Sequence, residues 1–233
     1  MNKFNVLDTK NNVNLKFNGK FFNVCKKIYN GVTPKYTFNV KTPSEPCIYV
    51  CRHLNLHAAL TINKCSTFDM QTYVLHVFTN QKSCFKQFYN YTFSKRCNKS
   101  KFFALFPSFI GSLFVPLICT QAQTIPVYRN NAEAVKTIKA SLNALNNGRS
   151  LLIFPNVDYT NQTNLETPQI YSGFLCVEKF YYKATNRHLK FIPLNIDDNL
   201  KTITEKPAVL FTGELPFSKE LPIVSKKIMD AIF

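Results

Sequence analysis

Acidic residues are scarce in this chain of 233 residues, which has 13 Asp and Glu against 29 Lys and Arg and a formal net charge of +16. A strongly basic protein attracts partners of opposite sign, so anionic lipid, nucleic acid or a phosphorylated substrate is favoured. Nucleic-acid binding also needs basic residues clustered with exposed stacking aromatics. The many phenylalanines here follow apolar patterns instead, and we expect no nucleic-acid partner.

Cysteine pairing motifs and a secretion signal are also missing. The eight cysteines include no C-x-x-C pair, which argues against a zinc ribbon or a disulfide framework and predicts reduced, mostly buried thiols. Residues 1–24 lack the unbroken apolar core of a secretory signal. We therefore expect the chain to be cytoplasmic.

Linkers rich in Gly, Pro or Ser are absent, and no internal repeat is visible. With 45% hydrophobic residues, the chain has ample apolar material for one core. We expect residues 1–46 to form an N-terminal appendage, built of strands or of a helix and a strand and packed on the main domain. Residues 47–233 are expected to form that domain, after the turn signal KTPSEP at residues 41–46.

One long uncharged run occurs at residues 102–119, FFALFPSFIGSLFVPLIC, directly after the basic cluster of residues 94–101. Its length is near the lower limit for a membrane span. Pro107 and Pro116 predict that a helix would break here. We favour a segment that dips into a membrane surface or lines an apolar groove, with a buried core hairpin and a transmembrane helix as alternatives.

The clearest local pattern is strand, helix, strand. Residues 124–129, TIPVYR, predict a strand with an arginine at its exit, and residues 130–148 predict an amphipathic helix that ends at Asn147-Gly148. Residues 149–155, RSLLIFP, predict a second buried strand. This order is typical of a crossover unit and favours an α/β sheet. The apolar stripe of the helix is expected to comprise Val135, Ile138, Leu142 and Leu145.

Further elements complete this architecture. Residues 47–51, CIYVC, predict a short buried strand, and a helix is expected to open near His53. Residues 189–196 and 207–217 predict two more strands, and residues 219–233 predict a closing helix. We expect a mixed central sheet flanked by helices.

His53 and His57 are spaced i and i+4 behind the strand CIYVC. Such a pair can bind zinc, but the metalloprotease pattern has Glu directly after the first His, where Leu54 stands, and no third ligand is apparent. We expect no metal site. A histidine here is either a general base, because imidazole titrates near neutral pH, or a hydrogen-bonded structural residue.

Four segments in order resemble the glycerolipid acyltransferases, which move a fatty acyl chain onto lysophosphatidic acid or a related glycerol phosphate. YVCRHLNLHA stands where the family has its His-x-x-x-x-Asp block, and IPVYR resembles the block with a phosphate-binding arginine. GRSLLIFPNVDYT resembles the strand that ends in Phe-Pro-Glu-Gly-Thr, and FIPLNI resembles the fourth block. The resemblance covers residues 40–217 and implies a glycerol-phosphate acyltransferase-like fold with a membrane-facing apolar segment.

The resemblance also implies roles for particular residues. His53 takes the place of the general base, and His57, one helical turn on, is a candidate to hold its ring. Arg129 is expected to hold the acceptor phosphate through two parallel charge-assisted bonds, with Arg52 as a second phosphate contact. The other expected substrate-binding residues are Phe154, Pro155, Asn156 and Val157.

Three positions depart from the family pattern. Ala58 stands at the aspartate position, and Asn156 and Val157 stand at the Glu and Gly of the third block. The aspartate fixes the tautomer of the imidazole, so Asp69 or Asp158 is a candidate substitute from elsewhere in the chain. Asn156 can donate its amide to the acceptor or to the developing oxyanion, whereas a glutamate only accepts hydrogen bonds.

The expected function is membrane-associated transfer of a fatty acyl chain from acyl-CoA or acyl carrier protein to lysophosphatidic acid or a related lysophospholipid, in phospholipid synthesis. The expected location is the cytoplasmic face of the cell membrane, peripheral or membrane-dipping. We expect no cofactor beyond the acyl donor, and an anionic membrane surface, the lysophospholipid and the donor as partners. The alternative is a family member with weakened or lost catalysis that binds lipid or a partner through the same groove.

Overall fold

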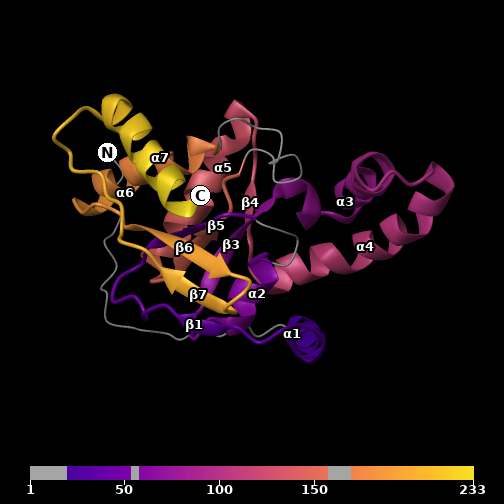
Figure 1. Ribbon diagram of the computed structural model, residues 1–233. Coiled ribbons are helices and arrows are strands. Elements are labelled where there is room, and N and C mark those ends of the chain that lie inside the picture. The colour runs from indigo at the N-terminus through magenta and orange to yellow at the C-terminus, as the bar shows by residue number, and fades with distance from the viewer. Residues whose placement is uncertain (1–19, 54–57, 157–168) are drawn as a thin grey trace. The chain divides into compact units, whose positions relative to one another are not determined.

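The computed structural model describes residues 20–53, 58–156 and 169–233 (Figure 1). Its strands are β1 (Thr37–Asn39), β2 (Ile48–Cys51), β3 (Met70–Leu75), β4 (Ile125–Val127), β5 (Ser150–Ile153), β6 (Phe191–Asp197) and β7 (Thr202–Glu205). The α-helices are α1 (Lys20–Val32), α2 (Ala58–Cys65), α3 (Gln81–Gln87), α4 (Lys101–Gln121), α5 (Asn131–Asn146), α6 (Cys176–Thr185) and α7 (Phe217–Ile232). Shorter helical segments are η1 (His76–Thr79), η2 (Phe88–Arg96, π-helical) and η3 (Ser172–Leu175).

The strands form one mixed sheet in the order β1-β7-β6-β2-β5-β3-β4. Strand β2 pairs in parallel with β5 and with β6, β3 pairs in parallel with β4, and β1 in parallel with β7. Only the pairing of β6 with β7 is antiparallel among the pairings described. The expected α/β class, with a mixed central sheet flanked by helices, is confirmed.

The chain divides into two compact units. Unit 1 contains Asn30–Gln71 and Ile138–Phe233, and unit 2 contains the described residues 20–29 together with Thr72–Thr137. The helix and strand expected before residue 46 are present as α1 and β1. The domain boundary expected at residue 46 itself stays a prediction.

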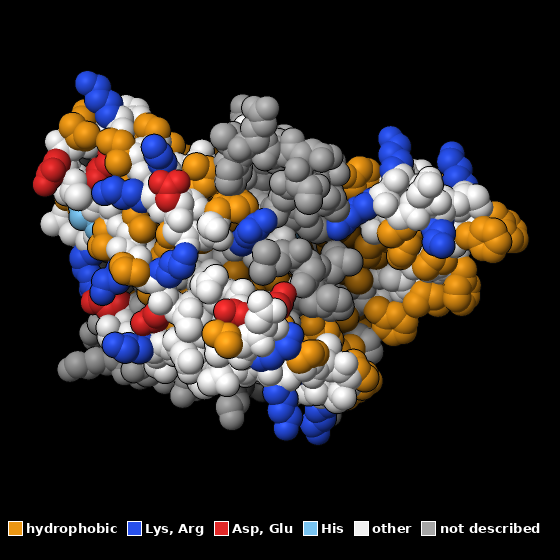
Figure 2. All heavy atoms as spheres, viewed as in Figure 1, with side chains coloured by type: hydrophobic (Ala, Val, Ile, Leu, Met, Phe, Trp, Pro, Cys, Tyr) orange, Lys and Arg blue, Asp and Glu red, His pale blue; other side chains and the backbone are white. Residues whose placement is uncertain are grey.

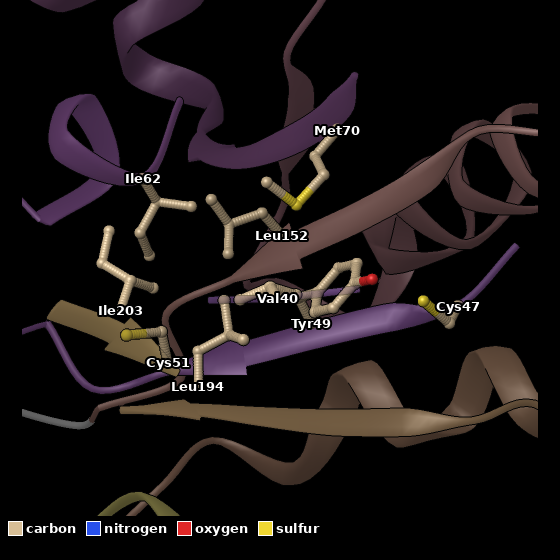
Figure 3. Close-up of a cluster of buried hydrophobic side chains, with 9 residues drawn as sticks. All are labelled: Val40, Cys47, Tyr49, Cys51, Ile62, Met70, Leu152, Leu194 and Ile203. Atoms are coloured by element: carbon tan, nitrogen blue, oxygen red, sulfur yellow. The ribbon is translucent and has the colours of Figure 1, made fainter. Parts of the chain in front are cut away.

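The core of unit 1 surrounds β2, whose four residues are all buried. Side chains alternate between the two faces of a strand, so Tyr49 and Cys51 point to one face and Ile48 and Val50 to the other. The first face is filled by a cluster that Figure 3 shows together with Tyr49: Val40, Cys47, Cys51, Ile62, Met70, Leu152, Leu194 and Ile203. Helix α7 packs against β2 and β6 through buried residues that include Val224 and Ile228. Burial on both faces explains why CIYVC is an unbroken apolar run.

The start of β6 is anchored by a buried carboxylate on α6. Glu178 is 2% exposed, accepts the backbone N–H of Leu189 at 2.8 Å and contacts Nδ1 of His188 at 2.6 Å. The ring of Tyr182 stacks on the ring of His188, with 4.4 Å between centroids. This set of contacts satisfies a carboxylate that would otherwise be costly to bury.

The strand expected over residues 207–217 is not present, and this prediction is wrong. Within that range only Val209 forms a bridge, antiparallel to Phe191. The backbone N–H groups of Thr212 and Gly213 donate to the carboxylate of Glu220, and Gly213 has a φ of +75°, which ends extended structure. Strand β7, which the sequence reading missed, supplies the further strand of the sheet.

Helix α5 forms as expected, but its predicted apolar stripe is wrong in part. Val135 is 51% exposed, and the face that is buried carries Thr137, Ser141, Ala144 and Leu145. The hydroxyl of Thr137 donates to the carbonyl of Pro126 at 2.9 Å and accepts the backbone N–H of Tyr128 at 3.0 Å. These bonds to β4 and its exit turn Thr137 inward and leave Val135 outside.

In unit 2, α4 packs against α3 and η2. It is one continuous helix that contains both Pro107 and Pro116, so the expected break and the alternative of a buried hairpin are wrong. A proline in a helix removes one backbone hydrogen bond and crowds the carbonyl four residues earlier, at a cost of about 3 kcal/mol. The hydroxyls of Ser108 and Ser112 donate within the helix, to the carbonyl of Ala104 at 2.6 Å and to that of Phe109 at 2.8 Å.

Large apolar side chains on α4 face outward (Figure 2). The exposed ones are Phe102, Phe103, Leu105, Phe106, Phe109, Ile110, Leu113, Phe114 and Leu117. Within the described part of the chain, α4 is the one helix long and apolar enough to cross a membrane, with a mean hydropathy of 2.1 over its most apolar window, of which 22% is buried. That finding concerns length and composition alone.

Candidate functional site

The candidate site lies at the carboxyl ends of the parallel strands β2 and β5, beside β6, which continues to Asp197. Val50 of β2 is in register with Ile153 of β5, and Cys51 of β2 is in register with Leu194 of β6. The residues that follow these strands therefore leave the sheet at one carboxyl edge. Ligands of α/β proteins bind at this edge, because the loops that leave parallel strands meet there.

The first and third predicted blocks are joined by a hydrogen bond. The backbone N–H of His53, after β2, donates to Oδ1 of Asn156, after β5, at 2.9 Å. Asn156 is 6% exposed, whereas His53 is half-buried with its Nδ1 atom buried. The two residues are 103 positions apart in the chain, so the contact depends on the parallel pairing of β2 with β5.

Phe154 and Pro155 shape the wall beside His53. The ring of Phe154 lies 5.1 Å from the imidazole, centroid to centroid, at an angle of 56°. The carbonyl of Pro155 accepts the backbone N–H of Tyr171 at 2.7 Å, and Asn156 forms an antiparallel bridge with Ile170. These backbone contacts hold the segment after β5 in place next to the histidine.

Arg52 lies beside a small pocket at the same edge. Its guanidinium sits 4.6 Å above the ring of Phe233, within cation–π range. The pocket has a volume of about 140 Å³, and its lining includes Arg52, Asn195, Ile196 and Phe233. Pockets for whole drug-sized ligands are roughly 300–1,000 Å³, so this one has room only for a small polar group.

Cys51 also lines this pocket, but its thiol is unreactive at neutral pH. Burial raises the pKa of the Cys51 thiol to about 12, and a hydrogen bond with the backbone of Arg52 lowers it only in part. The thiol is therefore protonated at neutral pH and is a poor nucleophile. No group of three or more His, Cys, Asp or Glu that could hold a metal occurs in residues 20–53, 58–156 and 169–233.

The position that corresponds to the family aspartate carries no hydrogen-bonding group. Ala58 is the first residue of α2 and is 4% exposed. Its methyl group cannot orient an imidazole. Of the two carboxylates considered as substitutes, Asp69 stands directly before β3, and Asp158 lies outside the described residues.

Arg129 belongs to unit 2, in a basic setting of its own after β4. Next to it, Asn130 caps α5, since its Oδ1 accepts the backbone N–H of Glu133 at 2.7 Å. The ring of Tyr128 stacks on the ring of His76, with 4.8 Å between centroids. Nζ of Lys136 lies 5.1 Å from the centroid of the Tyr128 ring. Positive side chains at the amino end of a helix suit an anionic group.

The structure thus brings together Arg52, His53 and the segment Phe154–Asn156, and places Arg129 in unit 2. His57 and Val157 lie outside the described residues. Sequence reasoning missed Asn195 and Phe233. Asn195 could have been found, because it follows the buried part of β6 at the carboxyl edge, whereas no sequence pattern points to Phe233.

No family model, curated protein or solved structure matches this chain. The acyltransferase resemblance, and the roles that it implies for these residues, therefore stay predictions.

Proposed function

We propose that this protein is a membrane-associated O-acyltransferase that moves a fatty acyl chain from acyl-CoA or acyl carrier protein to lysophosphatidic acid or a related lysophospholipid. The observation that carries the proposal is the 2.9 Å hydrogen bond between His53 and Asn156. It unites two of the four segments that resemble the family, at the sheet edge where ligands of α/β proteins bind. Arg52, Phe154 and Pro155 lie close to this bond.

Acyl transfer from a thioester to a hydroxyl needs a general base placed next to the hydroxyl. The imidazole of His53 takes the proton of the acceptor hydroxyl as its oxygen attacks the thioester carbonyl. The carbon–sulfur bond then breaks, and the imidazolium returns the proton to the departing thiolate. Arg52, in the same unit as His53, is proposed to bind a phosphate oxygen of the acceptor. A phosphate contact by Arg129, in unit 2, stays a prediction of the resemblance.

Helix α4 supports a membrane location by the way its faces are divided. The side chains that it buries are small, Ala104, Ser108 and Ser112 among them, while its largest apolar side chains are exposed. A helix at the surface of a water-soluble domain shows the reverse. Small residues against protein and large apolar residues outward are typical of helices that contact lipid.

The charge next to α4 fits an anionic lipid surface. Lys95, Lys99 and Lys101 are exposed directly before and at the start of the helix. Each basic residue near such a surface contributes about 1 kcal/mol of attraction. We propose that α4 inserts its phenylalanines into the bilayer boundary while these lysines meet the lipid head groups.

The test is acyl transfer from labelled acyl-CoA and acyl carrier protein thioesters to a panel of lysophospholipids in vesicles. We expect turnover in the wild type and a loss of at least about 100-fold in His53→Gln, which keeps side-chain size but not basicity. His188→Gln is the matched control, since it removes a histidine outside the site and keeps a donor for Glu178. Unchanged turnover in His53→Gln would refute the role of this residue.

The second candidate is a relative that binds lipid without turning it over. The buried methyl group of Ala58, where the family has its aspartate, favours this alternative. It predicts lysophospholipid binding that His53→Gln leaves unchanged, together with no transfer from any thioester. Measuring binding and turnover on the same preparations separates the two candidates.

A further inference from the structure

The side-chain amide of Asn156 has one satisfied end and one unsatisfied end. Its Oδ1 accepts the backbone N–H of His53, while its Nδ2 is buried and has no hydrogen-bond partner among the described residues. The whole residue is 6% exposed. Buried polar groups in proteins are nearly always hydrogen-bonded, so this donor points to a group that binds there.

The orientation of the amide follows from the contact with His53. A backbone N–H can only donate, so the atom that faces it must be an acceptor, and in asparagine that atom is Oδ1. The opposite orientation would place two donors against each other. Nδ2 therefore offers N–H groups to a different neighbour, and whatever satisfies them must supply an acceptor oxygen.

The location of Nδ2 of Asn156 limits which acceptor oxygen can bind it. Asn156 lies at the carboxyl edge of the sheet, where its Oδ1 accepts the backbone N–H of His53, and its backbone is held by the bridge to Ile170. A donor that is fixed before the ligand arrives stabilises charge well, because it needs no reorganisation during the reaction. A hydrogen-bond donor on a residue that contacts His53 suits the carbonyl oxygen of the acyl donor. This oxygen becomes negative when the acceptor hydroxyl, deprotonated by His53, attacks the carbonyl carbon.

We propose that Nδ2 of Asn156 binds the carbonyl oxygen of the acyl thioester and stabilises the negative charge on it in the tetrahedral intermediate. This inference rests on the proposed function and assigns the residue that faces the acyl donor. As the acceptor oxygen bonds to the carbonyl carbon, its proton passes to His53 and the π electrons of the carbonyl move onto the oxygen. When that electron pair returns, the carbon–sulfur bond breaks and the thiolate takes the proton from His53.

The decisive variant is Asn156→Asp, which has the same shape and still accepts the N–H of His53 but lacks the donor. We expect kcat to fall about 100- to 1,000-fold with an unchanged KM for the donor, as for loss of one oxyanion donor. Because a carboxylate raises the pKa of a neighbouring histidine, kcat is compared on the plateau of each pH profile. Asn199→Asp, in an exposed turn, adds the same charge and is expected to keep wild-type kcat. An Asn156→Asp protein with wild-type kcat, or one matched by Asn199→Asp, overturns the inference.

Binding gives a second readout that does not depend on turnover. The probes are a ketone analogue of palmitoyl-coenzyme A, in which a methylene replaces the sulfur, and the thioether S-hexadecyl-coenzyme A, which has no carbonyl. We expect the wild type to prefer the ketone by about fivefold, the value of one hydrogen bond, and Asn156→Asp to lose that preference. Equal preference in both proteins overturns the inference.

A measurement on the wild type alone covers the case in which Asn156→Asp does not fold. In protein labelled with 15N, the side-chain amide signals of Asn156 are expected to shift with the ketone and not with the thioether, and identical responses overturn the inference. Failure of the proposed function looks different. In that case the wild type binds neither analogue and transfers no acyl group, whereas failure of the inference alone leaves transfer intact.

Discussion

Two apolar segments of this chain end in opposite environments. The four residues of β2 are completely buried between two layers of unit 1. In α4, the longer of the two, only 22% of the most apolar window is buried. Apolar composition predicts that a segment avoids water, but it does not say whether protein or another apolar phase replaces the water.

The difference lies in which side chains each segment turns toward protein. Strand β2 offers large side chains to both faces, and neighbours such as Leu152 and Leu194 fill the space around them (Figure 3). Helix α4 offers Ser108 and Ser112 to unit 2 and leaves its phenylalanines outside (Figure 2). The burial of β2 makes it part of the core, whereas α4 as a contact surface is a proposal, and substitutions can test this distinction.

The largest effect is expected from Leu152→Ala in the core around β2. Leu152 is completely buried, and its removal leaves a cavity that the neighbouring strands cannot close. The free energy of unfolding is expected to fall by about 3 kcal/mol, as measured by urea denaturation. Leu105→Ala on α4, where the side chain is 51% exposed, is the control and should cost less than a third of that. Equal losses would remove the distinction between the two segments.

The second prediction concerns lipid contact by α4. Phe106 is 73% exposed, and Phe106→Ser is expected to weaken binding to vesicles of anionic phospholipid by about 2 kcal/mol, or roughly 30-fold, with unchanged stability. Leu200→Ser is the control, since Leu200 is equally exposed, at 73%, in the turn before β7. Sedimentation with vesicles at low and high salt measures both. If Leu200→Ser weakens binding as much as Phe106→Ser, α4 is not the contact surface.

The third prediction compares the contributions of a buried and an exposed glutamate to stability. Glu178→Gln removes a charge whose carboxylate bonds His188 and the backbone of Leu189 in the interior. We expect a loss of about 2 kcal/mol in stability by thermal unfolding, because hydrogen bonds to a charged buried group are among the stronger ones. Glu133→Gln breaks the exposed pair with Lys136 and keeps a helix-capping side chain, so no measurable change is expected. A smaller loss in Glu178→Gln than in Glu133→Gln would contradict the prediction.

The sequence predicted β2, β5 and α5 because buried strands and amphipathic helices have strong local patterns. The resemblance between ordered segments also predicted that His53 and Asn156 belong to one site; the two residues are in contact, and their roles stay a prediction. Sequence reading failed where side-chain contacts decide local structure. The carboxylate of Glu220 accepts the backbone N–H groups of Thr212 and Gly213, so these groups are not available to a strand partner. It failed again at Val135, which the hydrogen bonds of Thr137 turn outward.

The prolines of α4 show a different limit of sequence reading. Proline lowers helix propensity, so Pro107 and Pro116 predicted a break. Packing of α4 on α3 and η2 outweighs that local cost. The orientation of the Asn156 amide was equally out of reach, since it depends on a backbone N–H that is 103 positions away.

A thiol in the core gives a test of burial by pH. Burial raises the pKa of Cys51 from its ordinary value of 9.0 to about 12, so the folded protein keeps this thiol protonated while the unfolded chain ionises above pH 9. Stability from this group is complete below pH 9 and is lost as pH rises through the interval up to 12. Between pH 8 and pH 10, the wild type should lose about 1.4 kcal/mol more than Cys51→Ala. Parallel pH profiles would show that this thiol is not buried as described.

The smallest effect is expected at two helical glycines, one in the middle of α4 and one near the end of α1. A Cβ at Gly111 of α4 would lie 2.7 Å from Cε2 of Phe88, whose ring is confined by Phe78 and Phe93, whereas a Cβ at Gly31 of α1 would meet nothing within 4 Å.

Alanine at either position gains about 1 kcal/mol of helix propensity. At Gly31 this gain is realised, so Gly31→Ala should raise stability by about that amount. At Gly111 the clash costs about 2 kcal/mol and outweighs the gain, so Gly111→Ala should lower stability by about 1 kcal/mol in urea denaturation. Opposite signs for one chemical change would show that the face of α4 toward Phe88 is packed against protein as closely as the core around β2. Equal signs would mean that α4 does not approach Phe88 as closely as described.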